Sequence, residues 1–399
     1  MSAQEALIDR VRVAADTCGV MRIAFYAPLK PPDHPVPSGD RRMARLLLQA
    51  LAHAGHETVL AARLRSRDGA GDPRRQERLR GLGRRLAARF VAHAKRDPAR
   101  RPDLWLTYHL YYKAPDWIGP EVAEALGIPY VVAEASLAGK RSGGAWDLGH
   151  RATAAALRRA ERVIGLNSAD REGVLGALAG PERWIAVKPF LDRAPFDRAV
   201  AARETVRRTL ARERGLDPAR PWLVAVAMMR ADVKLLSYRL LGAALARAGD
   251  RHFHLLVAGD GPARAEVESA LAPLGRRVVF LGALAEEEVP VLLAASDLYV
   301  WPALGEAYGL AILEAQAAGL PVLAGQVGGV GDIVAEGVTG VLTPEGDLDA
   351  FAIAAQSLLD DPARCRALGA AALRKVAAEH DLAAAARRLD GVLGALVRA

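Results

Sequence analysis

The chemistry that can be read most directly from this sequence lies around two acids, Glu306 and Glu314, with seven residues between them. Glu306 is predicted in a loop after a strand and Gly309 where a helix begins. The amides of Gly309 and Leu310 can then bind an anion, with the helix dipole behind them. A carboxylate at Glu314, inside that helix, can accept hydrogen bonds from a ribose diol, and Glu306 can hold hydroxyls of a sugar beyond the phosphates. Two ordinary solvated acids would show the same spacing, because charged residues are mostly exposed.

Two further groups of polar residues resemble metal sites in spacing but are interpreted structurally. Asp347 and Asp349 follow a strand and open a helix, where aspartate is favoured as a cap and by the helix dipole. His252 and His254 alternate on a strand and share a face, yet no third ligand is close enough in sequence to suggest zinc. The sequence therefore predicts no metal site.

Short apolar runs alternate with longer helical patterns from Met21 onward, which predicts parallel sheets with crossover helices. The runs are MRIAFYA, ETVLAA, DLWLTYH, YVVAEAS, RVIGLNS, WIAVKPF, WLVAVAM, HFHLLVAG, RVVFLGA, LYVWPA, LPVLAG and TGVLTP. Prolines and mixed polarity in Lys188–Asp197 separate two series of six. We expect an α/β fold of two doubly wound, Rossmann-like domains, at 1–195 and 196–380, with a helix at 381–399 packing back on the first. Ligands of such sheets bind beyond the carboxyl ends of the strands, so two facing sheets imply an interdomain cleft.

The segment Leu298–Asp347 resembles a known family. From Glu306 through Glu314 to QAAGLPVLAG, GGVGDIV and EGVTGVL, it is similar to the donor-binding half of the retaining GT-B glycosyltransferases of the group 1 (family 4) type. The resemblance extends back through WLVAVAMMRADVK, LLVAGDGP and VVFLGAL, and so covers essentially the whole second domain. The first domain resembles the family more weakly, through MRIAFYAPLKPPDHPVPSGDRRMARLL, the strand that ends in His109, and FLDRAPFD.

The resemblance implies how the second domain binds a donor. By it, Arg230 and Lys234 bind the donor diphosphate, and fixed cations there favour the transition state because the leaving nucleotide gains negative charge. Asp260 in GDGP belongs to the same cleft, as does Leu284 beside the base. The family often has one more residue between the two cations and a glycine after the lysine, where this chain has leucine. Plain turns would also explain the glycines near Asp260 and Leu284.

In the first domain the resemblance implies fewer residues. Gly39, flanked by Ser38, stands where the family commonly has a glycine pair close to the donor phosphates and the acceptor, although a loop before a capped helix also fits. His109 matches in position a family histidine that faces the transferred sugar, while a histidine at a strand end is also a common structural residue. Position after a strand assigns Glu134 and Lys140 to the acceptor, and Ser38 is assigned to it as the neighbour of Gly39.

Composition and charge describe a globular protein with one unusual segment. Of the 399 residues, 51% are hydrophobic and 25% charged, as in globular proteins, and the chain is long enough for two domains. Cys18 and Cys365 offer neither a disulfide framework nor metal-ligand spacing. The net charge is +8, and the segment Arg63–Arg101 alone holds 14 basic and 4 acidic residues. This basic amphipathic stretch suits an anionic membrane surface or a charged acceptor, and equally a solvated helix packed on its sheet.

The residues and the resemblance together predict a retaining glycosyltransferase that moves a sugar from a nucleotide-diphosphate sugar to an acceptor hydroxyl, on a glycan, a lipid precursor or a small molecule. The catalytic set implied is Glu306, His109, Arg230 and Lys234. Because cations and helix amides meet the phosphate charge, we expect no metal and no cofactor beyond the donor itself. A same-face route is expected, in which the leaving phosphate takes the acceptor proton.

Other functions and locations stay open at this point. Another GT-B nucleotide-sugar enzyme, such as an epimerase, or a non-catalytic basic binding module would share much of the pattern. Nucleic acid is not an expected partner, because the basic segment lacks interleaved aromatic residues. No apolar run approaches the ~18 residues that span a bilayer, and the first twenty residues lack a signal-peptide pattern. We therefore expect a cytoplasmic protein, with the inner face of the membrane as a second location.

Overall fold

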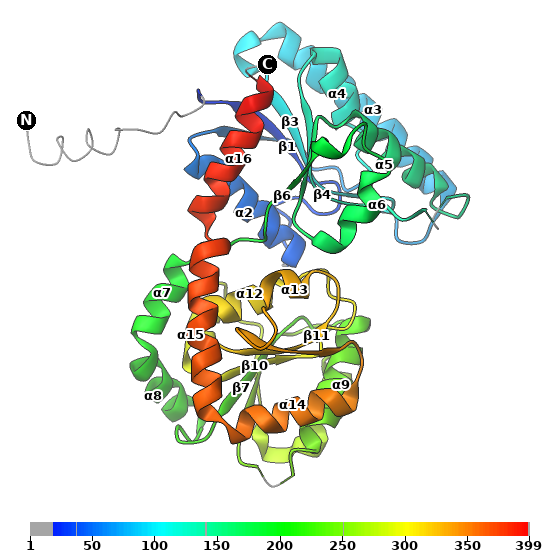
Figure 1. The fold of residues 1–399 in the computed structure, drawn as a ribbon. Helices are drawn as coiled ribbons and strands as arrows, with labels where there is room; N and C mark the ends of the chain where they lie inside the picture. The colour runs from blue at the N-terminus through cyan, green and yellow to red at the C-terminus, as the bar shows by residue number, and fades with distance from the viewer. Residues whose placement is uncertain (1–18, 37, 140–141, 250, 398–399) are drawn as a thin grey trace, which may run out of the picture. The chain divides into compact units, whose positions relative to one another are not determined.

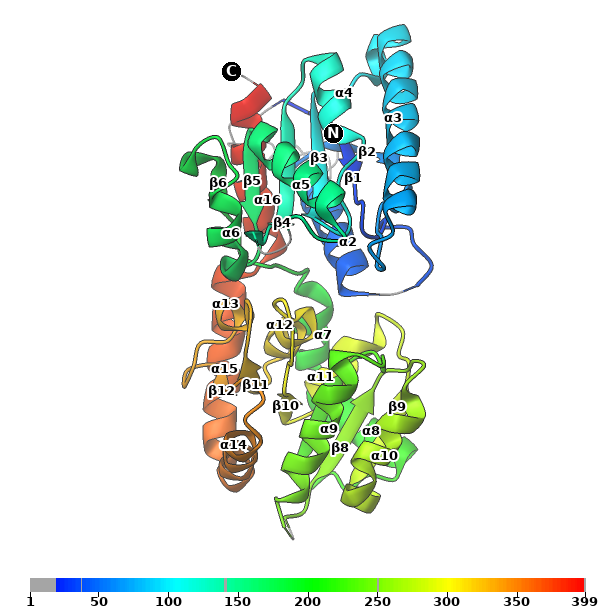
Figure 2. The same ribbon diagram turned by 90° about the vertical axis from the view of Figure 1, so that its right-hand side faces the viewer.

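The computed structural model describes residues 19–36, 38–139, 142–249 and 251–397. The chain divides into two compact units. The first comprises the described residues of Met1–Ile164, Gly173–Ile185 and Ala383–Ala399, and the second comprises those of Gly165–Glu172 and Ala186–Leu382. Figures 1 and 2 show that each unit is a sheet covered by helices on both faces, as expected from the alternating pattern of the sequence.

The sheet of the first unit has six strands in the order β2-β1-β3-β4-β5-β6. They are β1 (Arg22–Tyr26), β2 (Glu57–Ala62), β3 (Leu104–Tyr111), β4 (Tyr130–Ser136), β5 (Arg162–Gly165) and β6 (Trp184–Ala186). The predicted limits of β2 and β4 are confirmed, whereas β5 and β6 end three to four residues before the runs RVIGLNS and WIAVKPF do. The winding reverses between β1 and β3, so the carboxyl ends of these two strands form the switch point, the place at which doubly wound sheets bind ligands.

Helices cover both faces of this sheet. They are α2 (Gly39–His53), α3 (Pro73–Arg96), α4 (Gly119–Leu126), α5 (Asp147–Arg159), α6 (Arg171–Leu175) and α16 (Leu382–Val397). Figure 1 shows α2 and α16 over one face and α3, α4 and α5 over the other. The first turns of α2 and α3 are capped by Ser38 and Asp72, whose side chains accept from backbone amides. Between the sheet and α3, Trp105 is fully buried and its ring centre lies 5.4 Å from that of Phe90.

The sheet of the second unit also has six strands, in the order β12-β11-β10-β7-β8-β9. They are β7 (Trp222–Val226), β8 (His254–Ala258), β9 (Val278–Gly282), β10 (Leu298–Trp301), β11 (Val322–Gln326) and β12 (Gly340–Pro344). Their pairings are parallel. Here the winding reverses between β7 and β10. The two doubly wound units that the sequence predicts are therefore confirmed, and the switch point of the second lies at the carboxyl ends of β7 and β10.

The helices of the second unit follow the same two-layer plan. They are α7 (Ala194–Ala201), α8 (Arg203–Arg214), α9 (Val233–Ala246), α10 (Arg264–Leu271), α11 (Glu288–Ala295), α12 (Leu310–Ala317), α13 (Val330–Ile333), α14 (Leu348–Asp360) and α15 (Pro362–Glu379). In Figure 1, α9 and α14 lie over one face of the sheet and α7, α8 and α15 over the other. Asp347 caps α14 by accepting from the amide of Ala350 at 2.9 Å, which confirms its interpretation as a helix start.

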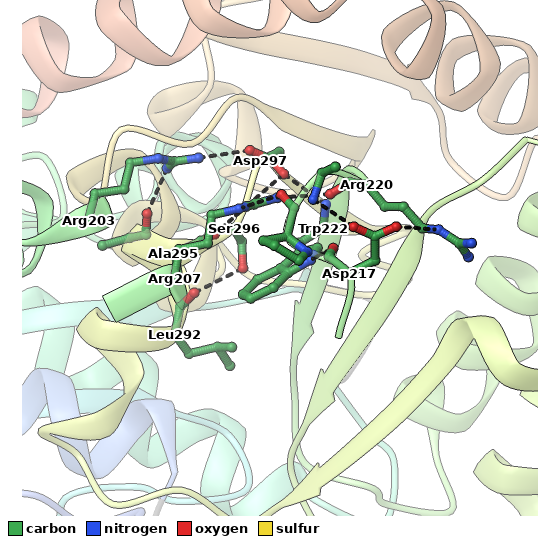
Figure 3. A network of polar contacts seen from close by, with 12 residues as sticks. Arg203, Arg207, Asp217, Arg220, Trp222, Leu292, Ala295, Ser296 and Asp297 are labelled. Carbon is green, nitrogen blue, oxygen red and sulfur yellow. Dashed lines mark hydrogen bonds and ion pairs between the residues drawn. The ribbon is translucent and has the colours of Figure 1, made fainter. Parts of the chain in front are cut away.

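A polar network ties β7 and β10 together at their amino ends. The carboxylate of Asp297 accepts from Arg203 at 2.8 Å, from Arg207 at 3.0 Å and from the amide of Trp222 at 2.8 Å. The guanidinium carbon of Arg207 lies 4.2 Å from the centre of the Trp222 ring. Figure 3 shows these side chains converging on Asp297. Because Trp222 begins β7 and Asp297 precedes β10, the network fixes the edge of the sheet opposite to the ligand-binding edge.

Within the described ranges of the chain, every helix is too short or too polar to cross a lipid bilayer.

Candidate functional site

The switch point of the second unit brings together two residues that the sequence places 72 positions apart. Lys234 lies in the first turn of α9, where Asp232 accepts its backbone amide at 2.9 Å and so caps the helix. Glu306 lies in the loop that follows β10, as expected. The ammonium group of Lys234 forms an ion pair with Glu306, and both side chains are largely buried, with 16% and 19% of their surfaces exposed. The Lys234 nitrogen also lies 5.4 Å from the ring centre of Trp301, the last residue of β10.

The loop that carries Glu306 has an unusual backbone. Ala303, Gly305 and Gly309 have φ values of 59°, 60° and 73°, a region that residues other than glycine rarely adopt. The next strand connection supports the loop from outside, because a Cβ atom on Gly328 would lie 2.4 Å from the carbonyl oxygen of Glu306. Only glycine fits at position 328. Such strain persists when surrounding structure holds it, and it concentrates at functional sites.

Glu314 and the start of α12 complete this edge of the sheet. Gly309 is the residue before α12, and its amide and that of Leu310 donate to no acceptor among the described residues. Glu314 lies inside α12, as predicted, with 5% of its surface exposed. Burial holds the pKa of Tyr299 on β10 well above its ordinary value, and the negative charges of Glu306 and Glu314 add to this. The two carboxylates and two helix amides therefore lie near the carboxyl end of β10.

Arg230 is close to this group in the chain but makes a different contact. Its Nε atom lies 3.0 Å from the carboxylate of Asp232, and 43% of its side chain is exposed. The loop of Arg230 rests on the GDGP turn, where the amide of Met229 donates to the carbonyl of Asp260 at 3.0 Å. The Asp260 carboxylate itself pairs with Arg264 at 3.3 Å. Asp260 thus supports the Arg230 loop through its backbone, while its carboxylate is used within its own turn.

The GDGP turn has glycines because the neighbouring backbone leaves no room for a side chain. A Cβ atom on Gly259 would lie 1.9 Å from the carbonyl oxygen of Ala227, and the amide of Gly259 donates to the carbonyl of Gly282 at 2.8 Å. Gly282, with φ of 73°, opens the turn that carries Leu284, which is half-buried. The loops after β7, β8 and β9 are therefore fastened to one another around the predicted donor residues.

In the first unit, the start of α2, with Ser38 and Gly39, is linked to His109 on β3 by Asp40, which was not among the predicted site residues. Ser38 caps α2 by accepting from Arg41 at 3.2 Å, and Gly39 is the first helical residue. The next residue, Asp40, has its carboxylate 2.9 Å from Nδ1 of His109. Burial, the largest single influence, would raise the pKa of Asp40, but the hydrogen bond with His109 and the positive charges of His109 and Lys30 together outweigh it, so the pKa is lowered. The helix-start signal around Ser38 could have drawn attention to Asp40, but not to its partner.

His109 and Glu134 share a rare backbone conformation. Their φ values are 63° and 62°, and the pairing of Tyr108 with Ala133 and of Leu110 with Ala135 sets them level on neighbouring strands. His109 was expected to end its strand. That expectation is wrong, because β3 resumes its pairing with β4 after His109 and continues to Tyr111. Glu134 is 6% exposed within β4, so it does not follow the strand.

Lys140, the remaining predicted acceptor residue, lies outside the described residues. The structure thus joins Lys234 with Glu306 in one unit, and joins the helix that begins at Gly39 with His109 in the other.

Known structures share this arrangement of two doubly wound units. The chain is similar to the UDP complex of Alr3699/HepE from Anabaena with a TM-score of 0.71, over 94% of this chain and 100% of that one. The two sequences are 19% identical, so this likeness concerns the fold alone. The chain has the GT-B fold.

Sequence comparison gives the family. The family model described as "Glycosyl transferases group 1" matches residues 220–361. The 2-deoxystreptamine N-acetyl-D-glucosaminyltransferase of Streptomyces fradiae is 33% identical over 305 residues, 72% of this chain and 70% of the relative. The D-inositol 3-phosphate glycosyltransferase of Rhodococcus opacus is 30% identical over 306 residues, 71% of this chain and 66% of the relative. The chain belongs to the group 1 glycosyltransferase family.

Two relatives from Streptomyces kanamyceticus match a smaller share of their own length. The 2-deoxystreptamine glucosyltransferase is 34% identical over 255 residues, which cover 61% of this chain and 65% of the relative. The α-D-kanosaminyltransferase is 31% identical over 240 residues, 59% of this chain and 61% of the relative. The chain thus spans just under two thirds of these relatives.

Proposed function

We propose that this chain is a retaining glycosyltransferase of the family 4 type, which transfers a sugar from a nucleotide-diphosphate sugar to an acceptor hydroxyl. One observation carries the proposal: Lys234 and Glu306 meet at the switch point of the second unit, beside the two unused amides that open α12. A buried cation, a carboxylate and a helix amino terminus in one place match the phosphates and the hydroxyls of a nucleotide sugar.

In the proposed donor complex, Lys234, Arg230 and the amides of Gly309 and Leu310 hold the diphosphate, and Glu306 holds hydroxyls of the sugar. Negative charge grows on the leaving phosphate as the bond to the anomeric carbon breaks. Fixed cations and amides therefore bind the transition state more strongly than the ground state. The charges present at this edge meet the phosphate charge, and we propose that transfer needs neither a metal nor another cofactor.

The acceptor is proposed to bind at the carboxyl edge of β1 and β3 in the first unit, near His109, Glu134 and Ser38. The acceptor oxygen bonds to the anomeric carbon on the face that the phosphate leaves, and the leaving phosphate takes the hydroxyl proton. Asp40 holds Nδ1 of His109 and so orients the imidazole ring, which we propose contacts a hydroxyl of the transferred sugar. Relatives named for 2-deoxystreptamine and inositol 3-phosphate suggest a cyclic polyol as the acceptor.

Two substitutions with a matched control test the proposal. A thermal-shift screen over UDP-, GDP- and ADP-sugars first identifies the donor, since a ligand of the folded state raises the apparent stability. Lys234→Met is expected to lose the thermal shift, and Glu306→Gln is expected to lower kcat. The rate of transfer should fall roughly 10²-fold or more in each variant. Arg239→Ala, exposed on the same helix as Lys234, should change neither. Unchanged transfer in both site variants would contradict the assignment.

A contact with an anionic membrane surface is proposed for α3. Five of its arginines are exposed at intervals of four and seven residues, which places them on one side of the helix: Arg74, Arg78, Arg85, Arg89 and Arg96. None of the five forms an ion pair with another residue in the described part of the chain. Basic residues near an anionic bilayer contribute about 1 kcal/mol each, so one row of five suffices for reversible binding.

Sedimentation with vesicles tests this contact. The protein should pellet with phosphatidylglycerol-containing vesicles at low salt and not with pure phosphatidylcholine. The double variant Arg78→Glu/Arg85→Glu should stay in the supernatant, whereas Arg208→Glu, an exposed charge reversal on α8, should pellet like the parent. Equal pelleting of all three would rule out α3 as the contact.

A further inference from the structure

The segment that leaves β2 in the first unit carries a row of arginines on one side. Arg63, Arg65 and Arg67 are exposed, whereas Ser66 and Asp68, which alternate with them, are buried. Alternate residues of an extended chain point to the same side, about 6–7 Å apart. The three side chains therefore leave the segment on one side, where Arg63 reaches Asp33 and Arg65 donates to the carbonyl of Leu29 at 3.3 Å, both in the loop after β1.

The inward residues fasten the segment to the loops that follow β1 and β3. The amide of Ser66 donates to Pro28 at 3.0 Å, and its hydroxyl donates to Pro115 at 2.6 Å. The amide of Asp68 donates to the carbonyl of Lys113 at 2.8 Å. The arginine row and Lys113 are thus held together at the carboxyl edge of β2, β1 and β3, which includes the switch point of this unit.

The positive charge of this edge is only partly balanced. Arg63 pairs with Asp33 at 2.5 Å. Among the described residues, no ion pair joins Arg65, Arg67 or Lys113 to a carboxylate. Lys113 instead lies over the ring of Trp146, with its nitrogen 4.7 Å from the ring centre.

The acids of the same edge are engaged elsewhere. The carboxylate of Asp40 contacts His109, and that of Asp68 accepts from the side chain of Gln76 at 3.1 Å and from the amide of Ala70 at 3.1 Å. These carboxylates thus have hydrogen-bond partners of their own and form no ion pair with Arg65, Arg67 or Lys113.

One aromatic residue connects these cations to His109. The ring centres of Tyr111 and His109 are 5.3 Å apart. Burial raises the pKa of Tyr111, and a hydrogen bond with Arg67 opposes the rise, so Arg67 lies against the phenol. An anion held by Arg67 would therefore lie about one ring away from His109.

We propose that Arg65, Arg67 and Lys113 bind the anionic group of the acceptor, a phosphate monoester on a polyol, and so present its free hydroxyl near His109. This inference rests on the transferase function proposed above. A guanidinium group binds phosphate through two parallel hydrogen bonds, and an ammonium adds a point charge. The same row of cations repels an acceptor that bears ammonium groups, so charge selects among polyols of similar shape.

A phosphate titration tests the site without knowledge of the true acceptor. Saturating UDP occupies the donor site, and binding of radiolabelled inorganic phosphate is measured by equilibrium dialysis. Saturable binding is expected, weakened about tenfold in Arg67→Ala and in Lys113→Ala and unchanged in Arg208→Ala, an exposed arginine of α8. Melting temperatures that match the parent confirm that the variants are folded. Equal phosphate binding in all four proteins overturns the inference.

Transfer assays separate this inference from the proposed function. Release of nucleotide is followed with myo-inositol, myo-inositol 3-phosphate and 2-deoxystreptamine, and the phosphate ester is expected to be preferred by tenfold or more in kcat/KM. Arg67→Ala should raise the KM of the ester and leave the KM of the donor unchanged. Preference for the neutral or the amine acceptor overturns the anion site and leaves the transferase intact. Failure to bind any nucleotide sugar overturns the transferase, and this inference with it. If a donor binds but none of the three acceptors is used, the phosphate titration alone decides whether the anion site exists.

Discussion

The network around Asp297 makes a strong prediction for the stability of the second unit. Arg207 is 11% exposed, and it donates to Asp297 and to the carbonyl oxygens of Ala295 and Arg220 at 3.0, 2.6 and 2.8 Å. Bonds from a charged donor contribute roughly 1.5–3 kcal/mol each, but they share one side chain and are not additive. Removing one partner also leaves the Asp297 charge half-compensated. Arg207→Ala should therefore destabilise the unit by about 3–5 kcal/mol.

Calorimetry in parallel with urea unfolding measures this loss, because a protein of two units need not unfold in one step. The neighbouring change Arg208→Ala, at an exposed position, is the control and should stay within about 0.5 kcal/mol of the parent. Arg207→Lys keeps the positive charge but not the several donors of the planar guanidinium group, so its loss of stability should lie between those of Arg207→Ala and Arg208→Ala. At 10 °C the folded Arg207→Ala protein should still bind nucleotide sugar, since the network lies at the amino ends of the strands. An effect no larger than that of Arg208→Ala would refute the reasoning.

Three further predictions concern pH, the histidine and the glutamate loop. Burial, aided by neighbouring lysines, lowers the pKa of His380 to about 4, so the unfolded state binds more protons below pH ~6.5. Stability should be complete above that pH and fall by about 3 kcal/mol towards pH 4, and His380→Gln should flatten this slope in pH-dependent denaturation. Asp40→Asn should reduce kcat roughly 10- to 100-fold and move its pH profile, because it frees His109. Gly328→Ala should weaken nucleotide-sugar binding, because a Cβ atom at position 328 must displace the backbone at Glu306. Unchanged binding would show that this backbone tolerates the displacement.

Periodicity predicted the elements of both units well, because parallel strands buried on both faces leave nearly continuous apolar runs. The run ETVLAA coincides with β2, and Glu314 lies inside a helix that begins after Gly309, as expected. Periodicity could not predict contacts between residues that are distant in the sequence. Asp40 reads as an ordinary residue of a helix start until a strand 69 residues later places His109 beside it.

Backbone strain was equally invisible in the sequence. The residue types of His109 and Glu134 do not specify φ values near +60°, where glycine is favoured, and the sequence does not show that the two positions lie level where the pairing of β3 with β4 is interrupted. The arginines after β2 read as part of a general excess of charge. Their placement at a ligand-binding edge follows from hydrogen bonds that Ser66 and Asp68 make to distant loops.

The assignment of Ala383–Ala399 to the first unit has a practical consequence for exchanging units between related enzymes. A graft of the second unit needs two junctions, one near Ala186 and one near Leu382. A chain cut once, after residue 185, would lose the helix α16, whose Asp390 lies 3.1 Å from the fully buried His56 side chain. Chimeras that keep α16 with its own first unit should fold, whereas those that swap everything after residue 185 must also pack a foreign helix against His56.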